Sequence, residues 1–229
     1  MGSAFSVRYA GPPGWRRIPR VTRTVLVATA AGYLVTLFLG PSVLVLVPGP
    51  VLSGEVWRLV TYPLVNVAIL SVLFDLLLLW SFGSQMEPRW GSWRFAVFLL
   101  LATLSAGALG VLAERLLPGS FGVGLGWAAP LTALIVAWTL VGPGLPTSFF
   151  GLLPMTRLGF AAICLALVVF GELERTRYLA RLVFVLGGLP VAFLFERRGP
   201  GPRMRQPRLR APWSRRRFRV VSRESEQIH

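Results

Sequence analysis

The feature that most constrains this chain is a series of six long apolar runs that contain few charges. They lie at about 24–39, 59–81, 94–113, 122–141, 149–170 and 178–195, and short segments rich in Gly, Pro and charged residues separate them. A helix needs about 20 apolar residues to cross a bilayer. Runs such as FAVFLLLATL are apolar at odd and even positions alike, unlike the strands of a transmembrane barrel. We therefore predict an all-α, polytopic membrane protein.

Composition supports one membrane domain. Of 229 residues, 54% are hydrophobic and only 14% are charged, too few to coat a water-soluble globule of this size. We predict a basic cytoplasmic segment at 1–23, a six-span membrane domain at 24–195, and a basic, disordered cytoplasmic tail at 196–229.

The basic residues indicate the orientation. All 24 are Arg, a bias that favours a GC-rich and hence bacterial genome; five precede residue 24 and eleven follow residue 196. With both termini in the cytoplasm, nineteen Arg lie inside, four lie outside (Arg58, Arg115, Arg175 and Arg177), and Arg181 lies near the edge of the last span. Because Lys and Arg accumulate on the cytoplasmic side, we predict a multi-pass protein of the bacterial inner membrane with both termini cytoplasmic.

The tail and the single cysteine limit the partners. The tail mixes eleven Arg with Pro, Trp213 and Phe218, which favours anionic lipids at about 1 kcal/mol for each Arg near the surface. It carries no recognisable nucleic-acid module, so we expect no nucleic acid. Cys164 is the only cysteine, which excludes an intramolecular disulfide and sites that need several thiolates. We predict no cofactor and no metal.

Two strings near the second span resemble the rhomboid intramembrane serine proteases. They are EVWRLVTYPLVN, with Trp57 and Arg58, and LLLLWSFGSQMEPRWGSWRF, with Glu87 followed four residues later by Gly91. The resemblance covers roughly residues 25–195 and implies a six-helix rhomboid-like bundle. The EPRWG variant also looks like the non-catalytic relatives of the family.

The resemblance implies where a catalytic site would lie, and this chain departs from it there. The family's nucleophilic Ser on the fourth span falls on Gly126, and its His on the sixth span falls on Arg181, judged by Gly188. The His, His and Asn that the family favours on the second span become Asn66, Ser71 and Asp75. The only histidine is His229. Because a Ser needs a base near neutral pKa and Arg stays protonated, the pattern predicts a pseudoenzyme.

Asp75 is a charge near the middle of a predicted span, where a carboxylate costs at least about 2.5 kcal/mol. Two arrangements are open. In the first, Asp75 and Arg181 form an ion pair across the former catalytic centre. In the second, Arg181 extends to the outer interface, while Asp75 is protonated or hydrogen-bonded to Ser71, one helical turn away.

Small residues gather at the start of the fourth predicted span: Gly122, Gly124, Gly126, Ala128 and Ala129. Such a face lets membrane helices approach closely. A functional interpretation is a client groove at Gly122 and Gly124, partly covered by Trp127. Pro130 and Pro190 are expected to kink their helices, because each removes an intrahelical hydrogen bond.

The function that these patterns favour is a pseudoprotease that binds transmembrane segments of client proteins without cleaving them. Two alternatives come from other classes. One is a rhomboid-family serine-type peptidase with an atypical site, and the other is a small ion- or proton-coupled transporter that uses Asp75.

Overall fold

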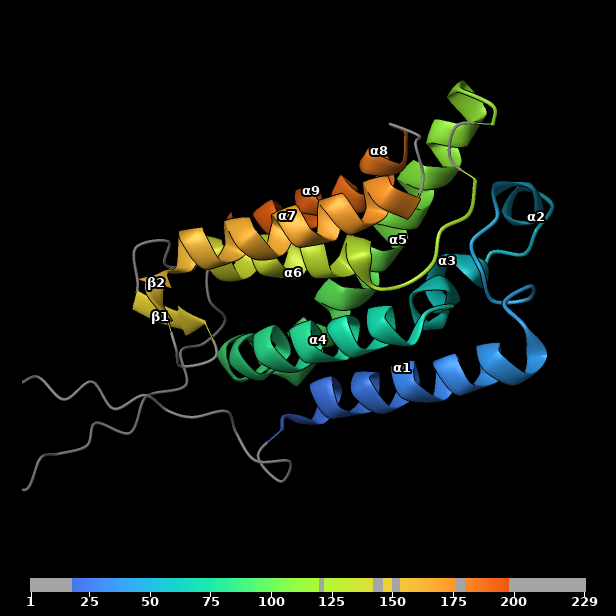
Figure 1. Ribbon diagram of the computed structural model, residues 1–229. Helices are drawn as coiled ribbons and strands as arrows, with labels where there is room; N and C mark the ends of the chain where they lie inside the picture. The colour runs from blue at the N-terminus through green and yellow to red at the C-terminus, as the bar shows by residue number, and fades with distance from the viewer. Residues whose placement is uncertain (1–17, 120–121, 142–145, 150–152, 176–179, 198–229) are drawn as a thin grey trace, which may run out of the picture.

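The computed structural model describes residues 18–119, 122–141, 146–149, 153–175 and 180–197. Within these ranges the chain is a bundle of helices with one short hairpin (Figure 1). The basic segment at 1–17 and the tail from 198 on, with Trp213, Phe218 and His229, lie outside the described residues. The helices are α1 (Arg20–Leu39), α2 (Pro48–Leu52), α3 (Arg58–Thr61), the 3-10 helix η2 (Tyr62–Leu64), α4 (Ile69–Trp90), α5 (Ser92–Leu116), α6 (Ala128–Leu140), α7 (Arg157–Arg175), α8 (Ala180–Leu186) and α9 (Leu189–Arg197).

The apolar runs form the long helices of the bundle. Three helices among the described residues, α1, α4 and α5, are long and apolar enough to cross a membrane, and α6 and the stretch Arg157–Gly171 of α7 are shorter apolar helices. This confirms a multi-pass, all-helical membrane bundle. The first and third predicted spans match α1 and α5 closely.

Four predicted spans differ from the structure, and the fifth of the six is described below with the hairpin that precedes it. The second was expected from residue 59, but α4 begins at Ile69, because residues 58–64 form the short helices α3 and η2 and the backbone is extended at Val65 and Ala68. The fourth was expected from residue 122, but α6 begins at Ala128. The sixth is divided into α8 and α9.

The two predicted kinks, at Pro130 and Pro190, are instead helix starts. Pro130 is the third residue of α6 and Pro190 is the second residue of α9. The first N–H groups of a helix have no intrahelical acceptor, so a proline there loses no hydrogen bond. The break before α9 also permits close packing: a Cβ added to Gly188 would lie 2.8 Å from Ala133 Cβ.

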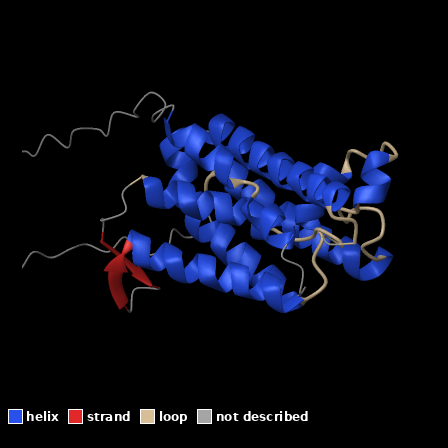
Figure 2. Ribbon diagram, turned by 90° about the horizontal axis from the view of Figure 1, so that it is seen from above, coloured by secondary structure: helices blue, strands red, loops and turns tan. Residues whose placement is uncertain are grey.

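A β-hairpin precedes α7 and was not predicted. Strands β1 (Pro146–Phe149) and β2 (Leu153–Thr156) pair antiparallel, with Pro146 opposite Thr156 and Phe149 opposite Leu153. The hairpin lies at one end of the bundle, which we call the hairpin end (Figure 2). The opposite end, with α2 and α3, is the loop end (Figure 1). The fifth span therefore begins at Arg157 and not at 149.

Helix α6 forms the centre of the bundle. It contacts α4, α5, α7, α8 and α9, and residues 129–135 are all buried. Its hydrophobicity on every side suits a helix that is surrounded by protein. At the hairpin end Trp138 packs edge-on against Phe82 of α4, with ring centroids 5.1 Å apart. The segment just before α6 is thus anchored to a rigid core.

Candidate functional site

The Trp-Arg motif organises the loop that follows α1. Arg58 is buried: its Nε donates to Glu55 Oε2 at 2.6 Å, and its Nη1 donates to the carbonyls of Ser42 at 2.7 Å and Val45 at 2.9 Å. Trp57 is half exposed. The guanidinium thus points into the protein and holds loop carbonyls together.

This loop in turn pairs with the segment before α6. Leu46 and Gly124 exchange two backbone hydrogen bonds, of 3.0 and 2.9 Å, and the N–H of Gly126 donates to the carbonyl of Tyr62 at 3.1 Å. Residues 122–127 therefore form a non-helical segment and not a small-residue helix face. Gly122 is exposed, and the backbone of Gly124 is occupied by Leu46. The residues of the predicted client groove therefore precede the fourth helix, and the groove itself stays a prediction.

Three of the degenerate positions meet at residue 126. Gly126 has a φ of 77°, and a Cβ added there would lie 3.2 Å from Asn66 Oδ1 and 3.5 Å from Asp75 Oδ2. Asp75 Oδ2 accepts a hydrogen bond from Asn66 Nδ2 and another from the backbone N–H of Trp127, each at 3.2 Å. Two donors that face position 126 therefore converge on one carboxylate oxygen.

Arg181 lies beside the same segment. It is only 3% exposed, and its Nη1 donates to the carbonyl of Val123 at 2.6 Å. The guanidinium is therefore enclosed by protein, not extended into the outer interface. One turn later, Phe184 packs on the Tyr62 ring, with centroids 5.2 Å apart. The ion pair between Asp75 and Arg181 stays a prediction.

A cleft opens between α4 and α7, both of which pack on α6. Its volume is about 300 Å³, and we call it the α4/α7 cleft. One end of it is polar, with Asn66, Ser71, Asp75 and Gly126. The remaining wall is largely apolar and includes Leu70, Phe74, Leu78, Phe160, Cys164 and Leu167. The cleft joins the polar positions around Gly126 to a hydrophobic surface.

Trp127 connects this cleft to the first helix. It belongs to the wall, but its side chain is buried and its Nε1 donates to Thr29 Oγ1 of α1 at 2.8 Å. The indole thereby links the segment before α6 to the first helix. Sequence reasoning missed this contact because 98 residues separate the two partners.

Glu87 and Gly91 connect α4 to α1 and α5 at the hairpin end. Glu87 is 1% exposed and its carboxylate accepts hydrogen bonds from the N–H groups of Val21 (2.9 Å) and Thr22 (2.7 Å), from Thr22 Oγ1 (2.8 Å) and from Ser92 Oγ (2.6 Å). Val21 and Thr22 are in the first turn of α1, so this carboxylate caps that helix. Gly91, at a φ of 83°, ends α4 and lets α5 begin at once.

Comparisons with known proteins agree with this architecture. The family model for the Rhomboid domain matches residues 53–198. The rhomboid protease GlpG of Enterobacter sp. (strain 638) is 36% identical over 59 residues, which are 26% of this chain and 21% of that protein. GlpG of Salmonella newport (strain SL254) is 36% identical over 58 residues, which are 25% of this chain and 21% of that protein. The chain therefore aligns with about a fifth of the length of these relatives. Because the family model covers more than half of the chain, the chain belongs to the rhomboid family.

Proposed function

We propose that this rhomboid-family protein is a pseudoprotease that holds a transmembrane segment of a client protein against the α4/α7 cleft without cleaving it. The observation that carries the proposal is the cleft itself, which joins an apolar wall to a polar end at Gly126. The client is an apolar helix of another membrane protein.

The chemistry at position 126 favours binding over hydrolysis. Gly126 has no hydroxyl to attack a peptide bond, and the single histidine of the chain is His229. A substrate carbonyl also needs hydrogen-bond donors for its developing negative charge. Here the Trp127 N–H and the Asn66 amide already donate to Asp75. A carbonyl would have to displace a carboxylate from both donors.

The shape of the cleft favours contact with one face of a helix. Its α4 wall runs from Leu70 to Ser81, about 17 Å at 1.5 Å per residue. The volume of a helix about 10 Å wide and of that length is several times the 300 Å³ of the cleft. A client helix therefore cannot enter the cleft whole, and it lies across the mouth and inserts side chains. The cleft also offers hydrogen-bonding groups to a client, on Asn66, Ser71 and Ser81. Within a bilayer such groups help helices associate, because no hydrophobic force drives them together there.

The charge distribution supports an inner-membrane location with both termini in the cytoplasm. At the hairpin end the described helices carry six Arg, namely Arg20, Arg23, Arg89, Arg94, Arg157 and Arg197, whereas four, Arg58, Arg115, Arg175 and Arg181, belong to helices or helix ends toward the loop end. An excess of Arg is typical of the cytoplasmic side. The basic tail then lies beside the inner leaflet, where its eleven Arg attract anionic lipids.

Photo-crosslinking tests the client site. A photoreactive phenylalanine analogue at Phe74, which lines the cleft, is expected to give discrete protein adducts in membranes of the native host. The matched control is the same analogue at Phe38 of α1, which is 81% exposed and outside the cleft. We expect the Phe74 adducts to map by mass spectrometry to a transmembrane segment of the partner. They should fall several-fold when Gly171→Leu narrows the cleft.

Equal adduct yields at Phe74 and Phe38 would mean that both positions contact other membrane proteins only through random encounters in the bilayer. Adducts at Phe74 that Gly171→Leu leaves unchanged would place the client outside the cleft. Either result rejects the proposed binding site.

A cleavage assay tests the absence of hydrolysis. The purified full chain in lipid vesicles is expected to leave a reconstituted transmembrane substrate intact, because position 126 has no nucleophile. Mass spectrometry of the substrate after prolonged incubation is the measurement. A product formed by the wild type and lost in Asp75→Asn would show that the enzyme alternative is correct, whereas a product unaffected by that change indicates a contaminating peptidase.

A further inference from the structure

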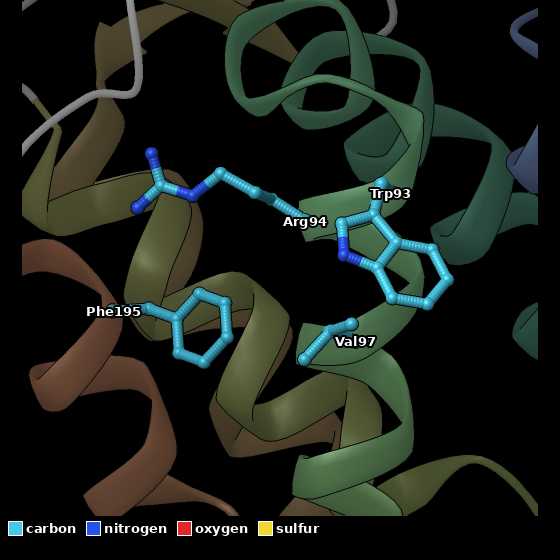
Figure 3. A pocket seen from close by; sticks show the side chains of 4 residues that line it. All are labelled: Trp93, Arg94, Val97 and Phe195. Atoms are coloured by element: carbon cyan, nitrogen blue, oxygen red, sulfur yellow. The ribbon is translucent and has the colours of Figure 1, made fainter.

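A small pocket at the hairpin end lies between α5 and α9, away from the α4/α7 cleft. It is lined by Trp93, Arg94 and Val97 of α5 and by Phe195 of α9, and its volume is about 130 Å³. Figure 3 shows the Arg94 side chain extending over Phe195 while Trp93 turns the other way. The pocket thus combines one guanidinium with three apolar side chains.

The floor of this pocket is rigid. The Phe195 ring packs against Phe98, with centroids 5.4 Å apart, and against Trp90 at 6.0 Å. Trp90 and Phe98 are buried in the main core. Phe195 is therefore held in place before any ligand arrives, which lowers the entropic cost of binding.

The charge around the pocket is positive. The Glu196 carboxylate accepts a hydrogen bond from Trp90 and interacts electrostatically with Arg89 and Arg94. Arg197 follows directly in the chain. Three guanidinium groups against one carboxylate leave a net positive charge at this corner, which favours an anion. Arg157, at the same end, is also cationic and interacts with Arg89, while the nearby Glu87 carboxylate is occupied by its donors on α1 and α5.

The position of Trp93 indicates where this corner lies in the bilayer. Its side chain is 80% exposed, in the first turn of a helix that is long enough to span the membrane. Tryptophan is enriched at the level of the lipid headgroups. The pocket volume corresponds to about four water molecules, which suits a phosphate and its glycerol neighbour and not a folded peptide.

We propose that the pocket formed by Trp93, Arg94, Val97 and Phe195 binds the phosphate of one anionic phospholipid, with Arg94 contacting the phosphate and the acyl chain descending along Val97 and Phe195. The lipid lies in the leaflet at the hairpin end, next to the tight connection between α4 and α5 at Gly91. A lipid fits better than free phosphate because three of the four lining side chains are apolar. The site is formed by α5 and α9 and does not depend on client binding.

Native mass spectrometry of the full chain with added phosphatidylglycerol tests this site. Arg94→Gln is expected to weaken the tightest phosphatidylglycerol adduct about fivefold, the effect of removing one charge near the membrane surface. The matched control is Arg115→Gln, which removes an exposed Arg from the opposite end of the same helix and should leave that adduct unchanged. Phosphatidylcholine, whose choline group cancels the charge of its phosphate, should bind more weakly and depend less on Arg94.

A second variant, Glu196→Gln, is expected to increase the affinity for phosphatidylglycerol. Glu196→Gln keeps an acceptor for Trp90 but removes the negative charge beside Arg94, so phosphatidylglycerol should bind more tightly. The proposal is overturned if Arg94→Gln and Arg115→Gln lose the adduct equally, if Glu196→Gln has no effect, or if inorganic phosphate alone displaces the lipid at equal concentration. Should Arg94→Gln fail to fold, the Glu196→Gln result decides.

Discussion

Replacing Glu87 with Ala is expected to lower the free energy of unfolding by about 3–5 kcal/mol, because it leaves several buried donors without an acceptor. The carboxylate accepts four hydrogen bonds from three residues on two helices. It also caps the first turn of α1, a contribution of about 1 kcal/mol by itself. Unfolding of the purified protein in mixed micelles, followed by helical circular dichroism, measures the loss.

The matched control is Glu114→Ala. Glu114 is a half-buried residue in the last turns of α5, and its carboxylate accepts a hydrogen bond from the exposed N–H of Gly119 at 2.7 Å. We expect its removal to cost about 1 kcal/mol, the net contribution of one hydrogen bond. Similar losses in the free energy of unfolding for the two variants would contradict the proposal that Glu87 connects α1, α4 and α5.

A methyl group added to Gly32 is expected to destabilise the bundle by about 1–3 kcal/mol, since overpacking displaces helices from well-packed positions. A Cβ there would lie 2.6 Å from the Leu64 carbonyl oxygen and 2.7 Å from Leu64 Cβ. The backbone of η2 provides the nearest of these atoms, so α1 must move for Gly32→Ala to fit. Thermal unfolding of the purified variant is the measurement.

Gly171→Ala is the control for this effect and has the opposite expected sign. A Cβ at Gly171, within α7, meets no atom within 4 Å. Alanine should therefore stabilise that helix by about 0.5–1 kcal/mol through its higher helix propensity. If Gly32→Ala were as stable as Gly171→Ala, α1 and η2 could not lie as close together as described.

The membrane bundle could be predicted because apolar runs of spanning length have few other stable arrangements. Helices α1 and α5 followed directly from hydrophobic length. The start of α6 could not be predicted in this way. Residues 122–127 are as apolar as a membrane-spanning helix, and their non-helical path depends on backbone hydrogen bonds to Leu46 and Tyr62, far away in the chain. The hairpin before α7 was missed for a similar reason, since its backbone pairing is not visible as a hydrophobic pattern.

The site was predicted only in part. The resemblance placed Asn66, Asp75 and Gly126 at corresponding positions, and the structure brings them together. What could not be predicted is the direction of the Trp127 N–H, which donates to Asp75, because a backbone dipole has no sequence signature. The burial of Arg181 was also open, since a long cationic side chain suits either a protein interior or an interface until its carbonyl partner is known.

The only thiol of the chain gives the cleft a built-in reporter. Cys164 is 3% exposed and stands in the cleft wall on α7, facing the region that a bound helix would cover. A maleimide label must enter through the same mouth to reach it. Because the thiolate is the form that reacts, the rate of alkylation of the unmodified protein is compared at one pH. At that pH an occupant of the cleft should slow the rate without any engineered residue.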